Sequence, residues 1–506
     1  MSETEKNVQT PSNVDADVIN DKADEQLPSE NSSEKNAEED ALPKENVNFY
    51  QGGTDRLKDL EGDKENIEER LSAIKEAVQD FFNMRNIHFL FGSGTSTPAI
   101  PTMREMHENV VKKLQENDSE EIFKEFNEIS KRIKNETNLE DILGILYSHR
   151  SYLKNSNSTF TEEEDSVSTE TTDTAEKDIK DPETICYELI KVIEEVIFNS
   201  INIELFKGRN LKTLPKPIQD NLSLYQEFYR KLALRNKDLA RLNIFTTNND
   251  LFNEYALDSL NIHYINGFGG GISKFFNPAL FNYNFAKRMD TSIEKFEPVE
   301  NMVYLYKIHG SINWVEDEQN ANTYFNIKEV TVPENVGDKN VLIYPAPTKQ
   351  NKSLGSPYVE MFREFQKKLL EPHSVLFISG YSFSDEHVNN IIYQALATNT
   401  TINVVILNDV SDTVIGKVDD NRIFKIWGQI FDSTNEAVPS KEEPSDEADA
   451  AQTTGSEGKS SLRKIHYFDY FVRELIPNID AFKNDDDILG KFLKGLKLSS
   501  NKDESK

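Results

Sequence analysis

The chain has 506 residues, and its 57 basic and 88 acidic side chains leave a formal net charge of −31. This acidity argues against direct binding of duplex DNA, because phosphate binding requires Lys and Arg to displace counterions. The single cysteine, Cys186, excludes an intrachain disulfide and a multi-cysteine zinc site. Since no apolar stretch approaches ~20 residues and the first residues lack a secretory hydrophobic core, we expect a cytoplasmic protein without a membrane segment.

Three stretches have the composition of unfolded chain. Residues 1–50 carry 13 acidic and 4 basic side chains and almost no aromatic residue. Residues 155–183 and 432–462 are similarly rich in Ser, Thr and Glu. Such segments cannot bury enough apolar surface to offset chain entropy. We therefore expect a disordered acidic N-terminal tail and two disordered loops. They leave a globular body over 51–431 and a helical segment over 463–497 that packs on it.

The globular part alternates short apolar runs with helical patterns, which predicts an α/β fold. Its sheet would be open, Rossmann-like and mostly parallel, with helices on both faces. The long helical stretch over 105–240, between the first two of these strands, predicts a large all-α insertion. The predicted strands are 87–91, 243–248, 303–310, 341–345, 374–380 and 402–408. The predicted helical stretches are 55–84, 104–153, 184–206, 218–238, 357–371, 385–398 and 464–482.

Glycines follow the first predicted strand, in the stretch Gly92-Ser93-Gly94-Thr95-Ser96. Ligands bind beyond the carboxyl ends of strands in open parallel sheets. Backbone N–H groups here could approach a pyrophosphate, which the N-terminus of a following helix would favour. A Gly-Ser turn after a strand is also common loop chemistry. These residues alone leave open whether the backbone passes close to a phosphate or to another part of the protein.

Three further polar clusters occupy equivalent positions. Residues 246–250, Thr-Thr-Asn-Asn-Asp, contain more polar groups than a helix N-cap requires. His309 ends an apolar strand, where a histidine is either a structural residue or a general base. The segment Gly380–Ser382, with Asp385 beyond it, follows another strand, and Asn408 follows the next. A turn with a helix N-cap explains this cluster plainly, and its hydroxyl and amide groups would also suit a ribose.

Taken in order, these clusters resemble the sirtuin (silent-information-regulator) superfamily. Sirtuins carry a G-A-G-x-S loop, a G-I-P-D-F-R stretch, T-Q-N-I-D, a catalytic H-G, G-T-S and an I-N. The chain departs from the second motif at Thr102, which stands in the place of its Asp. The corresponding segments here are Gly92–Ser96, Ala99–Arg104, Thr246–Asp250, His309-Gly310, Gly380–Ser382 and Leu407-Asn408.

A narrower resemblance is carried by four longer stretches. Protein-deacylating sirtuins hold a structural zinc on four cysteines, which this chain does not have. It is instead similar to sirtuin-like effectors of prokaryotic anti-phage defence, and most of all to the sirtuin-like subunit that works with a HerA-type hexameric ATPase. The stretches are "FGGGISKFFNPALFNY" (268–283), "LYKIHGSINW" (305–314), "VLIYPAPTKQNKSLGSPYVEMF" (341–362) and "SGYSFSDEHVNNIIYQAL" (379–396).

This resemblance implies an NAD glycohydrolase that cleaves NAD to nicotinamide and ADP-ribose and depletes it in infected cells. It implies NAD as substrate, no zinc ribbon, a HerA-type ATPase as partner and a homo-oligomer, with no membrane or direct nucleic-acid binding. Two alternatives stay open: an NAD-dependent protein deacylase, and a catalytically silent module that senses NAD or ADP-ribose.

The resemblance also assigns roles to individual residues. His309 would accept the proton, Asn248 would position water near C1′ of the ribose, and Asp250 would contact the nicotinamide carboxamide. The loop 92–96 would cradle phosphate through backbone N–H groups, and Ser382 and Asn408 would hydrogen-bond the adenosine side. The full NAD-binding set is Gly92, Ser93, Gly94, Thr95, Ser96, Thr247, Gly380, Ser382 and Asn408.

Overall fold

The structure is a computed structural model. It describes residues 45–60, 67–116, 120–133, 135–158, 181–208, 210–233, 235, 239–288, 296–299, 302–317, 319, 326–334, 340–342, 357–431 and 462–477.

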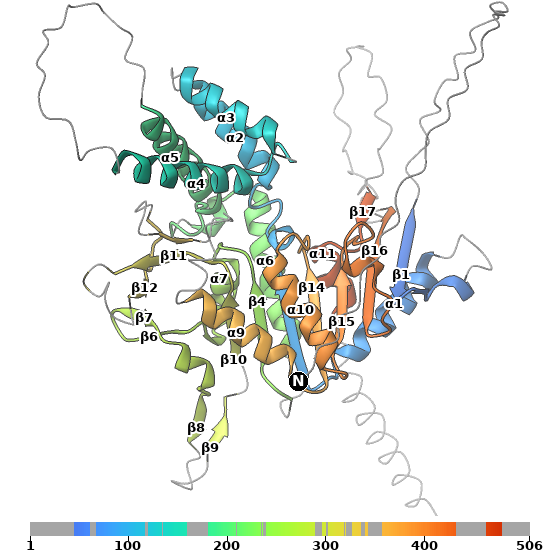
Figure 1. Cartoon of the computed structure of the whole chain (residues 1–506). Helices are drawn as coiled ribbons and strands as arrows, with labels where there is room; N and C mark the ends of the chain where they lie inside the picture. The colour runs from blue at the N-terminus through green and yellow to red at the C-terminus, as the bar shows by residue number, and fades with distance from the viewer. Residues whose placement is uncertain are drawn as a thin grey trace, which may run out of the picture. The chain divides into compact units, whose positions relative to one another are not determined.

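A large, mainly parallel sheet forms the centre of the fold (Figure 1). Its parallel strands lie in the order β16-β15-β14-β3-β4-β10-β5, and β1 and β17 pair with β16 in the antiparallel sense. Along the chain the sheet grows from β3 to β4 and β10, then returns to the other side of β3 with β14. The order therefore reverses between β3 and β14, the switch point at which Rossmann-type sheets bind ligands. The strands are β1 (Asn46–Gln51), β2 (Thr54–Asp55), β3 (Asn86–Phe91), β4 (Leu242–Thr246), β5 (His263–Ile265), β10 (Met302–Lys307), β14 (Ser374–Ser379), β15 (Asn403–Leu407), β16 (Ile423–Phe431) and β17 (Leu462–Lys464).

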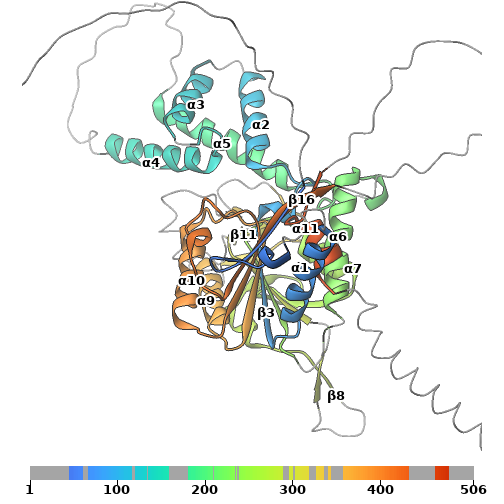
Figure 2. The same ribbon diagram turned by 90° about the vertical axis from the view of Figure 1, so that its right-hand side faces the viewer.

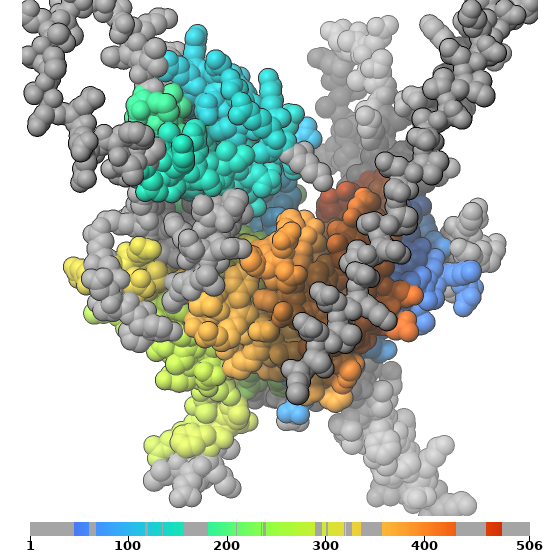
Figure 3. Space-filling model, viewed as in Figure 1, coloured from blue at the N-terminus to red at the C-terminus, as the bar shows by residue number. Residues whose placement is uncertain are grey.

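Helices cover both faces of this sheet, as predicted. Helices α9 (Tyr358–Leu369) and α10 (Glu386–Thr398) lie on one face; α1 (Ile67–Phe81), α6 (Lys216–Leu232), α7 (Phe252–Ser259) and α11 (Phe468–Tyr470) lie on the other (Figure 2). The orange side chains of α9 and α10 gather over the face turned to the viewer in Figure 3.

The central strands are mostly apolar because both of their faces are buried. In β3, Phe89 and Phe91 belong to the apolar cluster under α6, whereas Leu90 belongs to the cluster under α9 and α10. In β14, Phe377 belongs to the cluster under α6 and Ile378 to the cluster under α9 and α10. This two-sided burial is why these strands appear in the sequence as continuous apolar runs.

The predicted helical insertion contains four helices that pack on one another before α6. They are α2 (Met103–Glu116), α3 (Glu120–Arg132), α4 (Leu139–Ser158) and α5 (Pro182–Ile201). Their shared core includes Val110, Phe126, Leu143 and Ile193, all of which are fully buried. Helix α5 begins with Pro182 in its first turn, where the missing N–H costs nothing.

A smaller sheet lies beside the central one, in the order β13-β11-β12-β7-β6. Its strands are β6 (Phe268–Gly269), β7 (Lys274–Phe276), β11 (Gly310–Glu316), β12 (Ile327–Glu329) and β13 (Asn340–Leu342). A separate hairpin is formed by β8 (Ala286–Arg288) and β9 (Phe296–Pro298).

Several sequence boundaries differ from the structure. The expected strand over 303–310 ends at Lys307, because Gly310 adopts a positive φ of 82° and starts β11 of the smaller sheet. The expected strand over 341–345 falls in that sheet as β13, and 343–345 lie outside the described residues. The expected helix over 464–482 is described to residue 477 and contains α11 and one π-helical turn, Phe471–Leu475.

The predicted disordered segments lie outside the described residues except at their ends. Residues 46–50 belong to β1, whose side chains Val47 and Phe49 are buried beside β16. Helix α4 extends to Ser158 and α5 begins at Pro182, so both edges of the 155–183 stretch are helical. At β1, burial of Val47 and Phe49 outweighs the acidic composition that the prediction relied on. No helix among the described residues is long and apolar enough to cross a membrane.

Candidate functional site at the switch point

The two glycines after β3 are explained by the neighbouring backbone. A Cβ atom on Gly92 would lie 2.4 Å from the carbonyl oxygen of Gly380, and one on Gly94 would lie 2.7 Å from the Cα of Gly380. The N–H of Gly92 donates to Ser379 O and that of Gly94 to Gly380 O, both at 3.0 Å. The close approach that the glycines permit is therefore the contact between the ends of β3 and β14.

The predicted phosphate loop also uses most of its N–H groups internally. It forms a short 3-10 turn in which the N–H groups of Thr95 and Ser96 donate to Gly92 O and Ser93 O. Among the described residues, only Ser93 of this loop has an N–H without a hydrogen-bond partner, and its side chain is exposed. A pyrophosphate here would thus meet Ser93 and nearby hydroxyl groups rather than a cradle of five N–H groups.

Asn248 joins the β4 loop to the β3 loop. Its side-chain Nδ2 lies 3.0 Å from Gly92 O and 3.1 Å from the hydroxyl oxygens of both Thr95 and Ser96. These contacts fix the carboxamide so that Oδ1, which accepts no hydrogen bond from the described residues, is left as an acceptor. The neighbouring Thr247 donates its N–H to Phe91 O. An acceptor held in this way is able to orient a water molecule.

Asp250 is almost completely buried and both of its carboxylate oxygens are used within the protein. Oδ2 accepts a hydrogen bond from the Ser96 hydroxyl at 2.6 Å, and Oδ1 accepts the N–H of Phe252 at 3.0 Å. The side chain thereby ties the β3 loop to the start of α7. Contact with a nicotinamide carboxamide would require one of these bonds to be exchanged.

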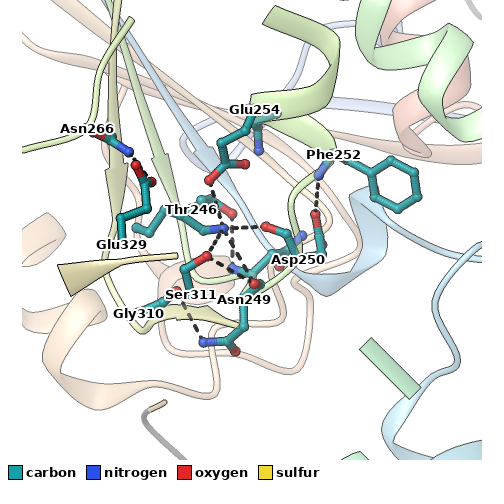
Figure 4. A network of polar contacts seen from close by, with 12 residues as sticks. Thr246, Asn249, Asp250, Phe252, Glu254, Asn266, Gly310, Ser311 and Glu329 are labelled. Carbon is teal, nitrogen blue, oxygen red and sulfur yellow. Dashed lines mark hydrogen bonds and ion pairs between the residues drawn. The ribbon is translucent and has the colours of Figure 1, made fainter. Parts of the chain in front are cut away.

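A buried ion pair of Lys307 and Glu254 contacts the loop after β4; Figure 4 labels Glu254 near Asp250 and Ser311. The Lys307 ammonium is 3.0 Å from the carboxylate of Glu254 and donates to the Ser311 hydroxyl at 2.7 Å and to the Asp250 carbonyl. Burial raises the pKa of Glu254, and Lys307 opposes that rise. Because one ammonium joins α7, the β4 loop and β11, the pair holds three segments of the site together.

Asn249 fixes the turn that carries His309. Its Nδ2 donates to the carbonyl oxygens of His309 and Gly310 at 2.8 and 3.2 Å, and its own carbonyl accepts the N–H of Ile312 (Figure 4). The positive φ of Gly310 makes the tight turn possible. Sequence analysis placed Asn249 in the 246–250 cluster without a role, because its partners are backbone atoms. It missed Lys307, whose main partner is a buried acid remote in sequence.

His309 pairs with an acid from the opposite side of the switch point. Its Nε2 lies 2.8 Å from Oδ2 of Asp385, and the two side chains are 17% and 23% exposed. Burial raises the pKa of Asp385, but hydrogen bonds from His309 and from the N–H groups of Val388 and His387 outweigh it and bring the pKa to about 2. The acid is therefore ionised at neutral pH and able to stabilise a charged imidazole.

The last predicted positions lie around the turn after β14. Asn408 donates its Nδ2 to Tyr381 O at 3.1 Å, which connects the end of β15 to this turn. Ser382 is exposed, and its hydroxyl is 3.0 Å from that of Ser384. Gly380 adopts a φ of +65° against the β3 loop.

The structure thus brings the predicted clusters together at one edge of the sheet. Hydrogen bonds join the loop 92–96 to residues 248 and 250, residue 249 to residue 309, and residue 309 to residue 385. Ser93 and Ser382 face solvent and make no side-chain hydrogen bond to the other clusters within the described part of the chain. Acceptors and exposed hydroxyl groups at a switch point fit a dinucleotide.

Comparison with protein families agrees with this geometry. Residues 242–422 match the family model of the SIR2-like domain. The match runs from the first residue of β4 to the residue before β16, so it contains every predicted cluster except the loop 92–96. It supports a sirtuin-like domain and, with it, NAD binding. A comparison with curated proteins finds no match to the chain.

The described residues contain no group of three or more His, Cys, Asp or Glu side chains arranged to hold a metal ion.

Proposed function

We propose that this protein is an NAD glycohydrolase that acts as an abortive-infection effector against phage, in an assembly with a HerA-type ATPase. The observation that carries the proposal is the arrangement of Asn248 and His309 around the switch point. Both side chains are held by hydrogen bonds on one side and keep one atom, Oδ1 and Nδ1 respectively, that the described residues do not engage. These two atoms supply what hydrolysis at a sugar carbon requires of a protein: a water acceptor and a base.

In the proposed reaction, the bond between C1′ of the ribose and the nicotinamide nitrogen breaks, and its electron pair leaves with nicotinamide. The oxygen of a water molecule bonds to C1′, and its proton passes to His309 and then to solvent. Asn248 orients the water. Ser93 and Ser382 offer hydroxyl groups to the rest of the dinucleotide. The products are nicotinamide and ADP-ribose.

The test is to incubate the full chain with NAD and follow nicotinamide and ADP-ribose. His309→Ala and Asn248→Ala should each lower kcat by about 10²–10⁴-fold, the range for loss of a general base or a positioned water. His387→Ala is the matched control, because His387 is an exposed histidine on the same edge of the sheet. Full turnover in both site variants would refute the mechanism.

The partner and the alternative activities are tested in the same assay. Nicotinamide release is measured with the chain alone and with a HerA-type ATPase, and we expect the assembly to be the active form. Addition of an acetylated peptide distinguishes a deacylase, which would form O-acetyl-ADP-ribose only when the peptide is present. Tight NAD binding with no product in any mixture would indicate a sensor instead.

A further inference from the structure

Asp385 contacts two different parts of the molecule through its two carboxylate oxygens. Oδ1 accepts the N–H groups of His387 and Val388 at 2.8 and 3.2 Å and so caps α10. Oδ2 instead lies 2.8 Å from Nε2 of His309, which reaches it from the turn after β10. A helix cap needs only one oxygen. The second oxygen is therefore available for a separate purpose.

The turn that presents Asp385 is strained and braced. Phe383 has a φ of +59°, a left-handed conformation that is unfavourable for a residue with a side chain. The turn is held by Asn389, whose Nδ2 donates to Phe383 O at 2.8 Å and whose Oδ1 accepts the Tyr381 hydroxyl at 3.0 Å. Strain maintained by buried hydrogen bonds indicates that the position of Asp385, two residues after Phe383, is specified.

We propose that Asp385 is a positioning residue for His309, which it holds in the tautomer that leaves Nδ1 as the proton acceptor. This inference rests on the proposed function and adds a residue to it. A carboxylate on Nε2 accepts the proton carried there, so the neutral imidazole has its lone pair on Nδ1. The same carboxylate stabilises the imidazolium that forms when Nδ1 takes a proton, as in a catalytic triad.

Other ionisable groups around the pair are few among the described residues. Tyr381 donates its hydroxyl to the Asp385 carbonyl, and burial raises the pKa of that hydroxyl. Glu386 and His387, in the first turn of α10, are exposed. Lys307, two residues before His309, is directed to the buried Glu254. Asp385 is thus the acid that faces the imidazole directly.

Three variants separate the two contacts of Asp385. Asp385→Asn keeps a capping oxygen but offers an N–H to Nε2, which favours the opposite tautomer. Asp385→Ser keeps a cap and is too short to reach His309. Glu386→Gln is the matched control, since it removes the same charge from the adjacent, exposed position.

The first measurement is ¹⁵N NMR of the full chain with labelled histidine, in which His309→Ala identifies one signal among the 8 histidines. In the parent protein we expect the proton on Nε2. Asp385→Asn should move it to Nδ1, and Asp385→Ser, which leaves Nε2 without its carboxylate acceptor, should populate both tautomers. Glu386→Gln should leave the tautomer almost unchanged. This measurement does not depend on NAD cleavage.

The second measurement is the rate of nicotinamide release. Asp385→Asn should lower kcat/KM by about 10²–10⁴-fold, and Asp385→Ser should lower it as well, whereas Glu386→Gln should leave it unchanged. If no variant or partner mixture cleaves NAD but the NMR shifts occur, the proposed function fails and the positioning role stands. If His309→Ala abolishes cleavage while Asp385→Asn and Asp385→Ser leave the tautomer and kcat/KM unchanged, the positioning role is overturned and the function stands.

Discussion

Gly92 provides the sharpest test of how the switch point is built. Its φ of −110° suits any residue, so Gly92→Ala has no conformational penalty. The substitution therefore tests only whether a Cβ atom fits at this position. The added Cβ would lie 2.4 Å from Gly380 O and 2.6 Å from Tyr381 Cα, whereas ordinary contacts begin at 3.4 Å. Two backbone segments would have to separate by about 1 Å, and neither is a flexible side chain.

Overpacking of this kind lowers the free energy of unfolding by about 1–3 kcal/mol, and we expect a value in the upper part of that range because the backbone must move. A loss of about 2 kcal/mol lowers the ratio of folded to unfolded protein roughly 30-fold. The assay is chemical unfolding of the parent protein and of Gly92→Ala, with NAD binding measured on the folded protein. Gly271→Ala is the control, because a Cβ there meets nothing within 4 Å.

The two explanations of the glycine give different results in this assay. If Gly92 served only to let a phosphate approach, Gly92→Ala would unfold at the parent midpoint and lose NAD affinity. If it serves the contact between β3 and β14, as the structure indicates, the midpoint falls. An unchanged midpoint for Gly92→Ala would refute the packing explanation.

Three further predictions concern buried polar contacts. Lys307→Met should lower the free energy of unfolding by about 3–5 kcal/mol, since it leaves Glu254 buried without its partner. In chemical unfolding, adding Glu254→Gln to Lys307→Met should restore part of this loss. If the effects of the two substitutions simply add, the prediction is contradicted. Asn408→Ala should lower the free energy of unfolding by about 1 kcal/mol, because it removes the hydrogen bond to Tyr381 O. An unchanged unfolding midpoint would count against this prediction. The pKa of Asp385 is about 2 in the folded protein, below its ordinary value of 3.8. Above about pH 4, ionised Asp385 therefore adds about 2 kcal/mol to the free energy of unfolding. This contribution is lost as the pH falls from 4 towards 2. The difference in melting temperature between the parent and Asp385→Ser should shrink over this range, and a constant difference would disprove the assignment.

The central strands were predictable because burial on both faces leaves a direct mark on composition. The runs at β3, β14 and β15 are apolar at nearly every position, and the structure places all three at the middle of the sheet. Strand β16 was missed, since its buried residues alternate with half-buried ones and an acidic stretch follows it. The end of β10 was misjudged because hydropathy does not reveal the positive φ at Gly310.

The site was predictable in its members and less so in their contacts. The clusters at 246–250, 309 and 380–382 were recognised from their positions after strands, and hydrogen bonds now connect them. Asp385 was interpreted as a helix cap, which it is. Its second bond is to His309, 76 residues earlier in the chain, and no local pattern predicts a contact at that separation. Gly92 was identified as a point of close approach, but its neighbour could only come from the structure.

The pairing of β1 with β16 has a consequence for how the protein is made. About 370 residues separate Gln51 from its partner Phe424, so β1 waits for β16 until all of the intervening residues have been synthesised. At 5–20 residues per second this delay is roughly 20–75 s. Buried apolar residues such as Val47 and Phe49 stay uncovered by β16 during that interval, when a chaperone or an unrelated edge strand is able to bind them.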